Sequence, residues 1–194
     1  GYSKLYVNAG KVTNKGIELA LGFKQNIGPV DWKTTLLWSL NRNRIDQLLP
    51  EYTNEELGVT VHLDEMDVYS LGGAKQRLTV GGSMGDVYVN TMRTDEHGHI
   101  WMNSMTGTLE TDKNNYVYAG NTNPKYTLSW RNEFNWKGIS LGFMLNARVG
   151  GIGVSATQAV MDYYGVSKTS AEARDNGGVK VNGQMIDAQT WYQT

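Results

Sequence analysis

A group of carboxylate side chains in this sequence is a possible metal-binding site. The segment 51–67 carries acidic residues at six positions, namely Glu51, Glu55, Glu56, Asp64, Glu65 and Asp67. Carboxylate oxygens bind Ca²⁺, but the spacing here does not match an EF-hand loop. The pattern therefore favours a solvated acidic surface over a calcium site.

A second possible metal ligand set is the pair His97 and His99, since imidazole commonly binds zinc. No third ligand stands near the pair, and the sequence contains no cysteine. Surface histidines at the tip of a hairpin, next to a turn at 95–98, are the simpler interpretation. We therefore expect no metal site and no cofactor.

Catalytic motifs give no stronger signal. Asp and Glu are plentiful, but the sequence has no nucleophile elbow and no phosphate-binding loop. We expect no enzymatic activity, assign no catalytic residue, and leave the substrate-binding residues unassigned.

Two long segments alternate strictly between apolar and polar residues. In 125–151 the apolar residues take even positions from Tyr126 to Trp136, then odd positions from Ile139 to Val149. The turn Lys137-Gly138 separates the two runs, and the change of phase keeps the apolar side chains of a hairpin on one face. The segment 16–41 repeats this design around a turn at 26–29. The sequence predicts two antiparallel hairpins, 16–41 and 125–151.

The predicted strands are longer than the ~5–6 residues of an average strand and reach the ~9–11 residues that cross a bilayer. Aromatic residues gather toward both short turns, with Phe23 and Trp32 in one hairpin and Phe134 and Trp136 in the other. Membrane-spanning barrels carry such aromatic girdles. The pattern favours the wall of a transmembrane β-barrel, although a soluble β-sandwich shares the alternation.

In a barrel wall one face contacts lipid and the other contacts a wet lumen. The lipid-facing candidates are Leu19, Leu21, Trp32, Leu36, Trp38, Leu128, Trp130, Leu141, Phe143 and Leu145. The lumen-facing candidates are Glu18, Lys24, Asp31, Lys33, Arg131, Glu133, Asn146 and Arg148. Replacing Leu141 by Arg is expected to cost roughly 2–4 kcal/mol if Leu141 lies at the bilayer midplane.

Connection lengths are unequal. Short turns join the strands of each hairpin, whereas 42–124 and 152–194 are long connections, the arrangement typical of bacterial outer-membrane barrels. Within them we expect strands at 78–84 and 86–92, a helical turn or two in 167–175 and a tight hairpin at 179–186. The predicted fold is all-β: an antiparallel segment of a transmembrane β-barrel with long extracellular loops, the barrel being incomplete.

Composition agrees with this prediction. The chain has 194 residues, 18 basic and 19 acidic, and this balance gives no reason to expect nucleic-acid binding. The mean hydropathy of −0.45 is compatible with barrel strands, because these alternate. We expect the sequence to be a piece of a longer polypeptide.

Several short motifs resemble the SusC/RagA family of TonB-linked outer-membrane transporters. NKGIEL at 14–19 is similar to a strand start of that family, and GNTNPKY at 120–126 is similar to the entry of a late barrel strand. The motifs FNWKG (134–138), NARVGG (146–151), ARDNGG (173–178) and VNG (181–183) follow in the family's order. The resemblance is weakest over 46–115.

The resemblance implies that 1–194 is a C-terminal part of the barrel, without the plug domain. It implies a parent protein in the Gram-negative outer membrane that imports oligosaccharides or peptides. The TonB complex would energise import through the plug, and a SusD-like surface lipoprotein would be the partner. A soluble β-sandwich that binds carbohydrate is the alternative, but Trp32, Trp38, Trp130 and Trp136 lie on strand faces, and not in loops.

Overall fold

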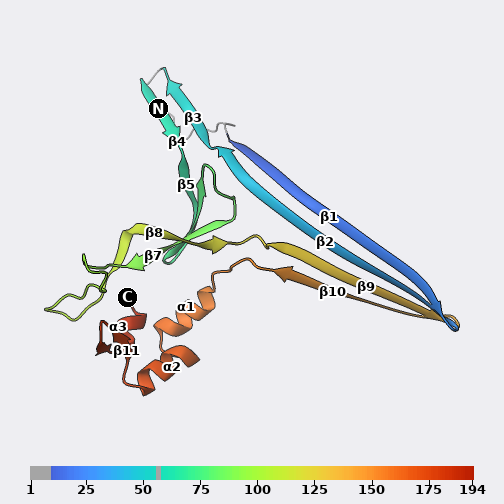
Figure 1. Ribbon diagram of the computed structural model, residues 1–194. Coiled ribbons are helices and arrows are strands. Elements are labelled where there is room, and N and C mark those ends of the chain that lie inside the picture. Colours follow the sequence, from blue (N-terminus) through green and yellow to red (C-terminus); the bar gives the residue numbers. More distant parts are fainter. Residues whose placement is uncertain (1–9, 56–57) are drawn as a thin grey trace. The chain divides into compact units, whose positions relative to one another are not determined.

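The computed structural model of the protein describes residues 10–55 and 58–194, and antiparallel β-sheets dominate it (Figure 1). The strands are β1 (Lys11–Ile27), β2 (Val30–Gln47), β3 (Leu49–Asn54), β4 (Val59–Leu63), β5 (Glu65–Leu71), β6 (Ala74–Thr79), β7 (Asp86–Met92), β8 (Thr111–Asn121), β9 (Tyr126–Trp136), β10 (Ile139–Val149), β11 (Val179–Val181) and β12 (Gln184–Ile186). The helices are α1 (Ala156–Tyr163), α2 (Lys168–Asp175) and α3 (Ala188–Tyr192). The prediction of an all-β antiparallel fold is confirmed, and the described strands form no closed barrel.

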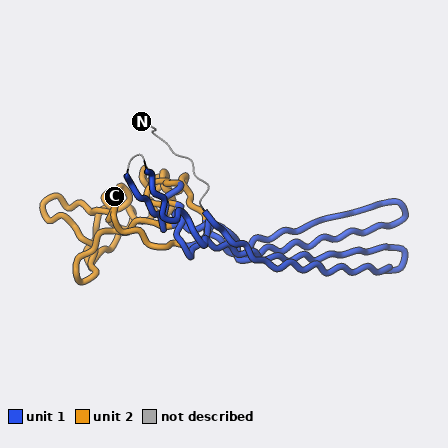
Figure 2. The backbone as a smooth tube through the Cα atoms, turned by 90° about the horizontal axis from the view of Figure 1, so that it is seen from above, with its two compact units in different colours: residues 1–68, 76–87, 120–152 blue, residues 69–75, 88–119, 153–194 orange. Residues whose placement is uncertain are grey.

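The strands belong to four sheets. The orders are β1-β2-β9-β10, β5-β6-β7-β8, β3-β4 and β11-β12. The described chain divides into two compact units (Figure 2): unit 1 holds 10–55, 58–68, 76–87 and 120–152, and unit 2 holds 69–75, 88–119 and 153–194. None of the helices in the described part of the chain is both long enough and apolar enough to cross a membrane.

The sheet β1-β2-β9-β10 contains both predicted hairpins. β1 pairs with β2 from Ile27–Val30 to Lys11–Gln47, so this hairpin is longer than 16–41. The predicted end of the strand at 41 is wrong, because the backbone of the polar run at 41–44 continues the ladder with β1. Lys137 and Gly138 both have positive φ, 46° and 86°, as the type I′ turn of a two-residue hairpin requires.

The connection 42–124 is not one long loop. It contains the end of β2 and six further strands, from β3 to β8. The prediction of a strand at 78–84 is wrong after Thr79, where β6 ends. Val80 to Gly85 turn back toward β2, and Gly81 has a φ of 87°. The strand predicted at 86–92 is confirmed as β7.

Unit 2 packs around a small core. Leu109, Val181 and Ile186 are buried together, and Trp191 is among the partly buried residues that pack on them. The predicted hairpin at 179–186 supplies two of the three core residues and turns at Asn182-Gly183. The helix predicted at 167–175 is confirmed, since Ser167 accepts a hydrogen bond from the Ser170 N–H and α2 follows it. The helices α1 and α3 were not predicted.

Candidate functional site

The register of β1-β2-β9-β10 sorts its side chains onto two faces. We call apolar face the one that carries the odd positions of 17–27, the even positions of 30–40 and 126–136, and the odd positions of 139–149. Residues paired across strands share a face, so the register assigns each row of partners to one side. The opposite side is called the charged face.

Rows of partners run across the apolar face. Leu21, Leu36, Trp130 and Leu145 form one row, and Leu19, Trp38, Leu128 and Ala147 form the next toward the loops. All ten candidates listed above as lipid-facing lie on this face. None of its positions carries Asp, Glu, Lys or Arg, yet Leu141 and Leu145 are 63% and 58% exposed. The described residues thus leave a long uncharged apolar surface uncovered.

Aromatic rings concentrate toward the turn end of this face. Trp32 stacks on Phe134 with ring centroids 6.2 Å apart, and Phe134 stacks on Phe143 at 6.3 Å. At the other end, Trp38 lies 6.4 Å from Tyr126 between ring centroids. The sequence indicated the first group, and the pairing of β2 with β9 creates the contacts between the two hairpins.

Two polar residues, Thr34 and Asn132, are register partners on the apolar face. The Trp32 indole N–H donates to Asn132 Oδ1 at 3.1 Å, and the Trp130 indole N–H donates to Thr34 Oγ1 at 2.9 Å. Asn132 is only 1% exposed, and its Nδ2 has no partner in the described structure. Each indole therefore obtains its acceptor from the neighbouring strand, without needing water.

The charged face collects all eight candidates listed above as lumen-facing. Arg131 and Glu133 form an ion pair along β9, and Lys33 is the register partner of Glu133. The Ser39 and Thr127 hydroxyls are 2.7 Å apart across β2 and β9. Over the same strand segments in which the apolar face has no charged residue, the charged face has seven. They are Glu18, Lys24, Asp31, Lys33, Arg131, Glu133 and Arg148. This face suits contact with water.

The segment 80–86 binds the loop end of the charged face through a polar network within unit 1. Asn43 Oδ1 accepts from the Ser83 hydroxyl and the Met84 N–H, both at 2.7 Å. Asp86, 7% exposed, accepts from the Ser83 N–H at 2.8 Å and from Asn121 Nδ2 at 2.7 Å. Ile45 is fully buried and exchanges backbone hydrogen bonds with Gly81 and Gly82. No local pattern in the sequence indicates this contact.

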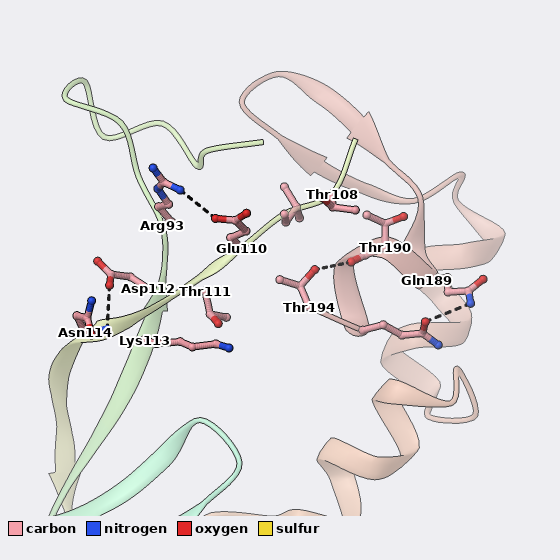
Figure 3. A pocket seen from close by; sticks show the side chains of 12 residues that line it. Arg93, Thr108, Glu110, Thr111, Asp112, Lys113, Asn114, Gln189, Thr190 and Thr194 are labelled. Atoms are coloured by element: carbon pink, nitrogen blue, oxygen red, sulfur yellow. Dashed lines mark hydrogen bonds and ion pairs between the residues drawn. The ribbon is translucent and has the colours of Figure 1, made fainter. Parts of the chain in front are cut away.

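Unit 2 contains a hollow of about 900 Å³ between 108–114 and α3 with the residues after it. Figure 3 shows its polar lining, including the ion pair of Arg93 with Glu110 at 2.9 Å and the hydrogen bond that the Thr194 hydroxyl donates to the Thr190 carbonyl oxygen. The lining presents both donors and acceptors, from hydroxyls, amides, Lys113 and Asp112. None of the described residues that line the hollow is aromatic. This chemistry suits a polar ligand.

A second hollow of unit 2, about 360 Å³, lies among α1, α2 and α3. Tyr163, Tyr164 and Tyr192 line it, and the rings of Tyr163 and Tyr164 meet edge to face with centroids 5.2 Å apart. Tyr164 is 70% exposed. Trp101 and Trp191 lie outside the two predicted hairpins and do not line this hollow. Trp191 packs on the core, and the Arg93 guanidinium lies over Trp101 at 4.4 Å.

The histidine pair lies at an exposed turn. The backbone N–H groups of His99 and His97 each donate to the Asp95 carboxylate at 2.9 Å. These hydrogen bonds, led by the one from His99, lower the pKa of Asp95 below its ordinary value. Among the described residues, no group of three His, Asp or Glu side chains is placed to hold a metal ion.

The acidic stretch is partly neutralised within the protein. Arg77 Nε lies 2.8 Å from Asp67 Oδ1, and its Nη1 lies 3.2 Å from Glu65 Oε2. Glu51 and Glu55 are in the described chain, whereas Glu56 lies outside the described residues.

Comparison with protein-family models and with curated proteins finds no match to the chain.

Proposed function

We propose that the sheet β1-β2-β9-β10 is part of the wall of an outer-membrane β-barrel transporter, with the apolar face toward lipid and the charged face toward a wet lumen. One observation carries the proposal: exposed, uncharged side chains cover one face, while seven charged residues lie on the other. A soluble protein that exposed so large an apolar surface would aggregate, whereas lipid removes the surface from water.

The length of the apolar face supports this orientation. From Val30 to Leu40 there are ten residue steps. At about 3.3 Å per step this is about 33 Å along the strand, or about 23 Å along the membrane normal at a tilt of 45°. The apolar band of such barrels is about 25 Å tall.

The satisfied indoles also support burial in lipid. A tryptophan N–H in hydrocarbon has no water to bond and must find an acceptor in the protein. The Trp32 indole donates a hydrogen bond to Asn132, and the Trp130 indole donates one to Thr34, both on the same face. Neither indole therefore requires a water molecule as acceptor.

In this orientation the two short turns lie on the periplasmic side, and the connections 42–124 and 152–194 lie outside the cell. The free edges of β1 and β10 require pairing with further strands, because about 8 strands are the fewest that close a barrel. The transporter would import oligosaccharides or peptides, driven by the TonB complex and with a SusD-like lipoprotein as its partner. The motifs at 14–19 and 120–126 are the basis for this part of the proposal.

Site-directed labelling tests the orientation. Because the sequence has no cysteine, single cysteines can be placed along 126–136 and 139–149 and exposed to a water-soluble thiol reagent in membranes. We expect labelling at odd positions of the first strand and even positions of the second, with the alternate positions protected. Uniform labelling along both strands would remove the basis of the proposal.

A soluble carbohydrate-binding module is the second candidate, and the exposed tyrosines of unit 2 favour it. Sugar rings stack on aromatic side chains, and Tyr163 and Tyr164 offer two such surfaces beside a hollow. For this candidate, the wild-type chain should stay monomeric without detergent and be retained on immobilised oligosaccharides. Tyr164→Ala should abolish that retention. Aggregation of the wild-type chain in detergent-free buffer would exclude it.

A further inference from the structure

A cluster of cations lies on the same side of the sheet as the apolar face, directly beyond its loop end. Lys15 and Arg42 are register partners, one step beyond the pair Ile17 and Leu40. Arg44, paired with Thr13, follows in the next row. We call Lys15, Arg42 and Arg44 the basic cluster. All three residues are exposed.

Like charges set directly opposite one another across strands repel and are destabilising. No acidic side chain in the described part of the chain lies within ion-pair distance of the basic cluster. Arg42 Nη1 donates to the Asn41 carbonyl at 3.0 Å, which leaves its other donors available. The nearest acidic residue on this side of β2, Asp46, accepts a hydrogen bond from the Thr13 hydroxyl. The cluster therefore retains uncompensated positive charge.

The position of this charge identifies its partner. Trp38 and Tyr126 lie in the two rows next to the cluster, on the side toward the short turns. Amphipathic aromatic rings are enriched at membrane–water interfaces, so these rows are expected at that level. A cation one row above that level meets the headgroups, and not the acyl chains or bulk water. Guanidinium groups bind phosphate oxygens through paired N–H donors, and lysine adds a point charge.

We infer that Lys15, Arg42 and Arg44 form a binding site for the phosphate of an anionic lipid in the leaflet at the loop end of the sheet. This inference rests on the proposed function, since it needs the apolar face to lie in lipid. The bound phosphate relieves the repulsion between Lys15 and Arg42 and fixes the depth of the sheet in the membrane.

The test uses the complete barrel of the proposed transporter, in which further strands pair with β1 and β10, folded into phosphatidylcholine vesicles with lipid A added at increasing mole fraction. Binding of a ligand to the folded state raises the urea midpoint, and the dependence on mole fraction gives an apparent dissociation constant. Each cation near a charged surface strengthens binding by about fivefold, so the three together contribute roughly a hundredfold at low ionic strength. We expect K15Q/R42Q/R44Q to weaken lipid A binding by at least about tenfold, and added salt to weaken binding by the wild type.

The matched control is K24Q/K33Q/R148Q, which removes three cations from the charged face of the same sheet. We expect this control to keep the wild-type dependence on lipid A. Loss of the dependence in both triple variants, or in neither, overturns the inference. In vesicles without lipid A, K15Q/R42Q/R44Q should unfold at the wild-type urea concentration or above, because the substitution removes repulsion; a lower midpoint there also counts against the inference.

Three further outcomes separate the possible sources of failure. If 50 mM inorganic phosphate in phosphatidylcholine vesicles stabilises the chain as much as lipid A does, the site binds free phosphate and the lipid assignment is wrong. If the wild type does not insert into phosphatidylcholine vesicles, the proposed membrane wall fails and the inference fails with it. Insertion without any response to lipid A overturns the inference alone.

Discussion

Arginine substitutions on β10 measure directly whether the apolar face lies in lipid. Leu145 belongs to a row near the middle of that face, whereas Leu141 lies only one row from the turn end. Leu145 is therefore the residue expected near the bilayer midplane, and the condition attached to Leu141, that it lie at the midplane, is better met by Leu145. Its neighbour Asn146 lies on the charged face of the same strand.

The expected magnitude follows from the depth of the residue. An Arg on the lipid face costs about 2–4 kcal/mol at the midplane and about 0–1 kcal/mol near the interfaces. For Leu145→Arg this is a fall of about 30- to 900-fold in the folding equilibrium constant, at 1.36 kcal/mol per factor of ten. Leu141→Arg should cost less, and Asn146→Arg should change stability by no more than about 0.5 kcal/mol.

The assay is equilibrium unfolding by urea of the complete barrel of the proposed transporter in phosphatidylcholine vesicles, followed by tryptophan fluorescence. The order of destabilisation should be Leu145→Arg, then Leu141→Arg, then Asn146→Arg. In a soluble protein Leu145, at 58% exposure, would be a surface position, and its replacement would change stability by about 0.5 kcal/mol or less. Equal effects at Leu145 and Asn146 would refute the assignment of the faces.

Four further predictions concern single contacts. Asn132→Ala should cost about 1–3 kcal/mol, because the Trp32 indole N–H loses its acceptor; adding Trp32→Phe should recover part of that loss in a double-mutant cycle measured by urea unfolding. Asp86→Ala should cost about 1–3 kcal/mol through the loss of acceptors for Ser83 and Asn121, whereas Glu96→Ala at an exposed turn should be near neutral; equal midpoints for the two variants would contradict this. Gly16→Ala should destabilise by about 1–3 kcal/mol because its Cβ would lie 2.7 Å from the Leu40 carbonyl oxygen, while Gly22→Ala, with open space around the added Cβ, should be tolerated or slightly stabilising; thermal unfolding of both variants checks the contrast. The lowered pKa of Asp95 means that its hydrogen bonds stabilise the 95–98 turn above the ordinary aspartate pKa and are lost as pH falls through the lowered value; an NMR titration of the His97 and His99 amides should show this change, and Asp95→Asn should remove it.

Local pattern determined a large part of the fold. Period-two alternation places each side chain of a strand on one of two faces, and a two-residue turn fixes the phase between neighbouring strands. For this reason, the ten residues grouped on one face from sequence share one face of the sheet, and the eight grouped on the other share the opposite face. The α2 helix was also predictable from the sequence, because its N-cap residue, Ser167, lies within the same short segment.

The long connections were poorly predicted. The residues of 42–124 form six strands after the end of β2, and several of them lack strict alternation. The turn at 80–85 follows a strand-like run, but contacts with Asn43 and Ile45 hold it in place. Those partners lie about 40 residues away, and short-range pattern carries no information about them.

The sequence by itself determined that the protein would have hairpins with one apolar and one charged face, because alternation and turn chemistry are local properties. Only the tertiary structure decided that β2 pairs with β9, which joins the two hairpins into one sheet and places Asn132 beside Trp32 and Thr34 beside Trp130. Only the tertiary structure extended β1 and β2 to set Lys15 opposite Arg42 beyond the apolar rows. The physical reason is that pairing between distant strands depends on complementary side chains and on the entropy of closing a long loop, and neither appears in the period of a single segment.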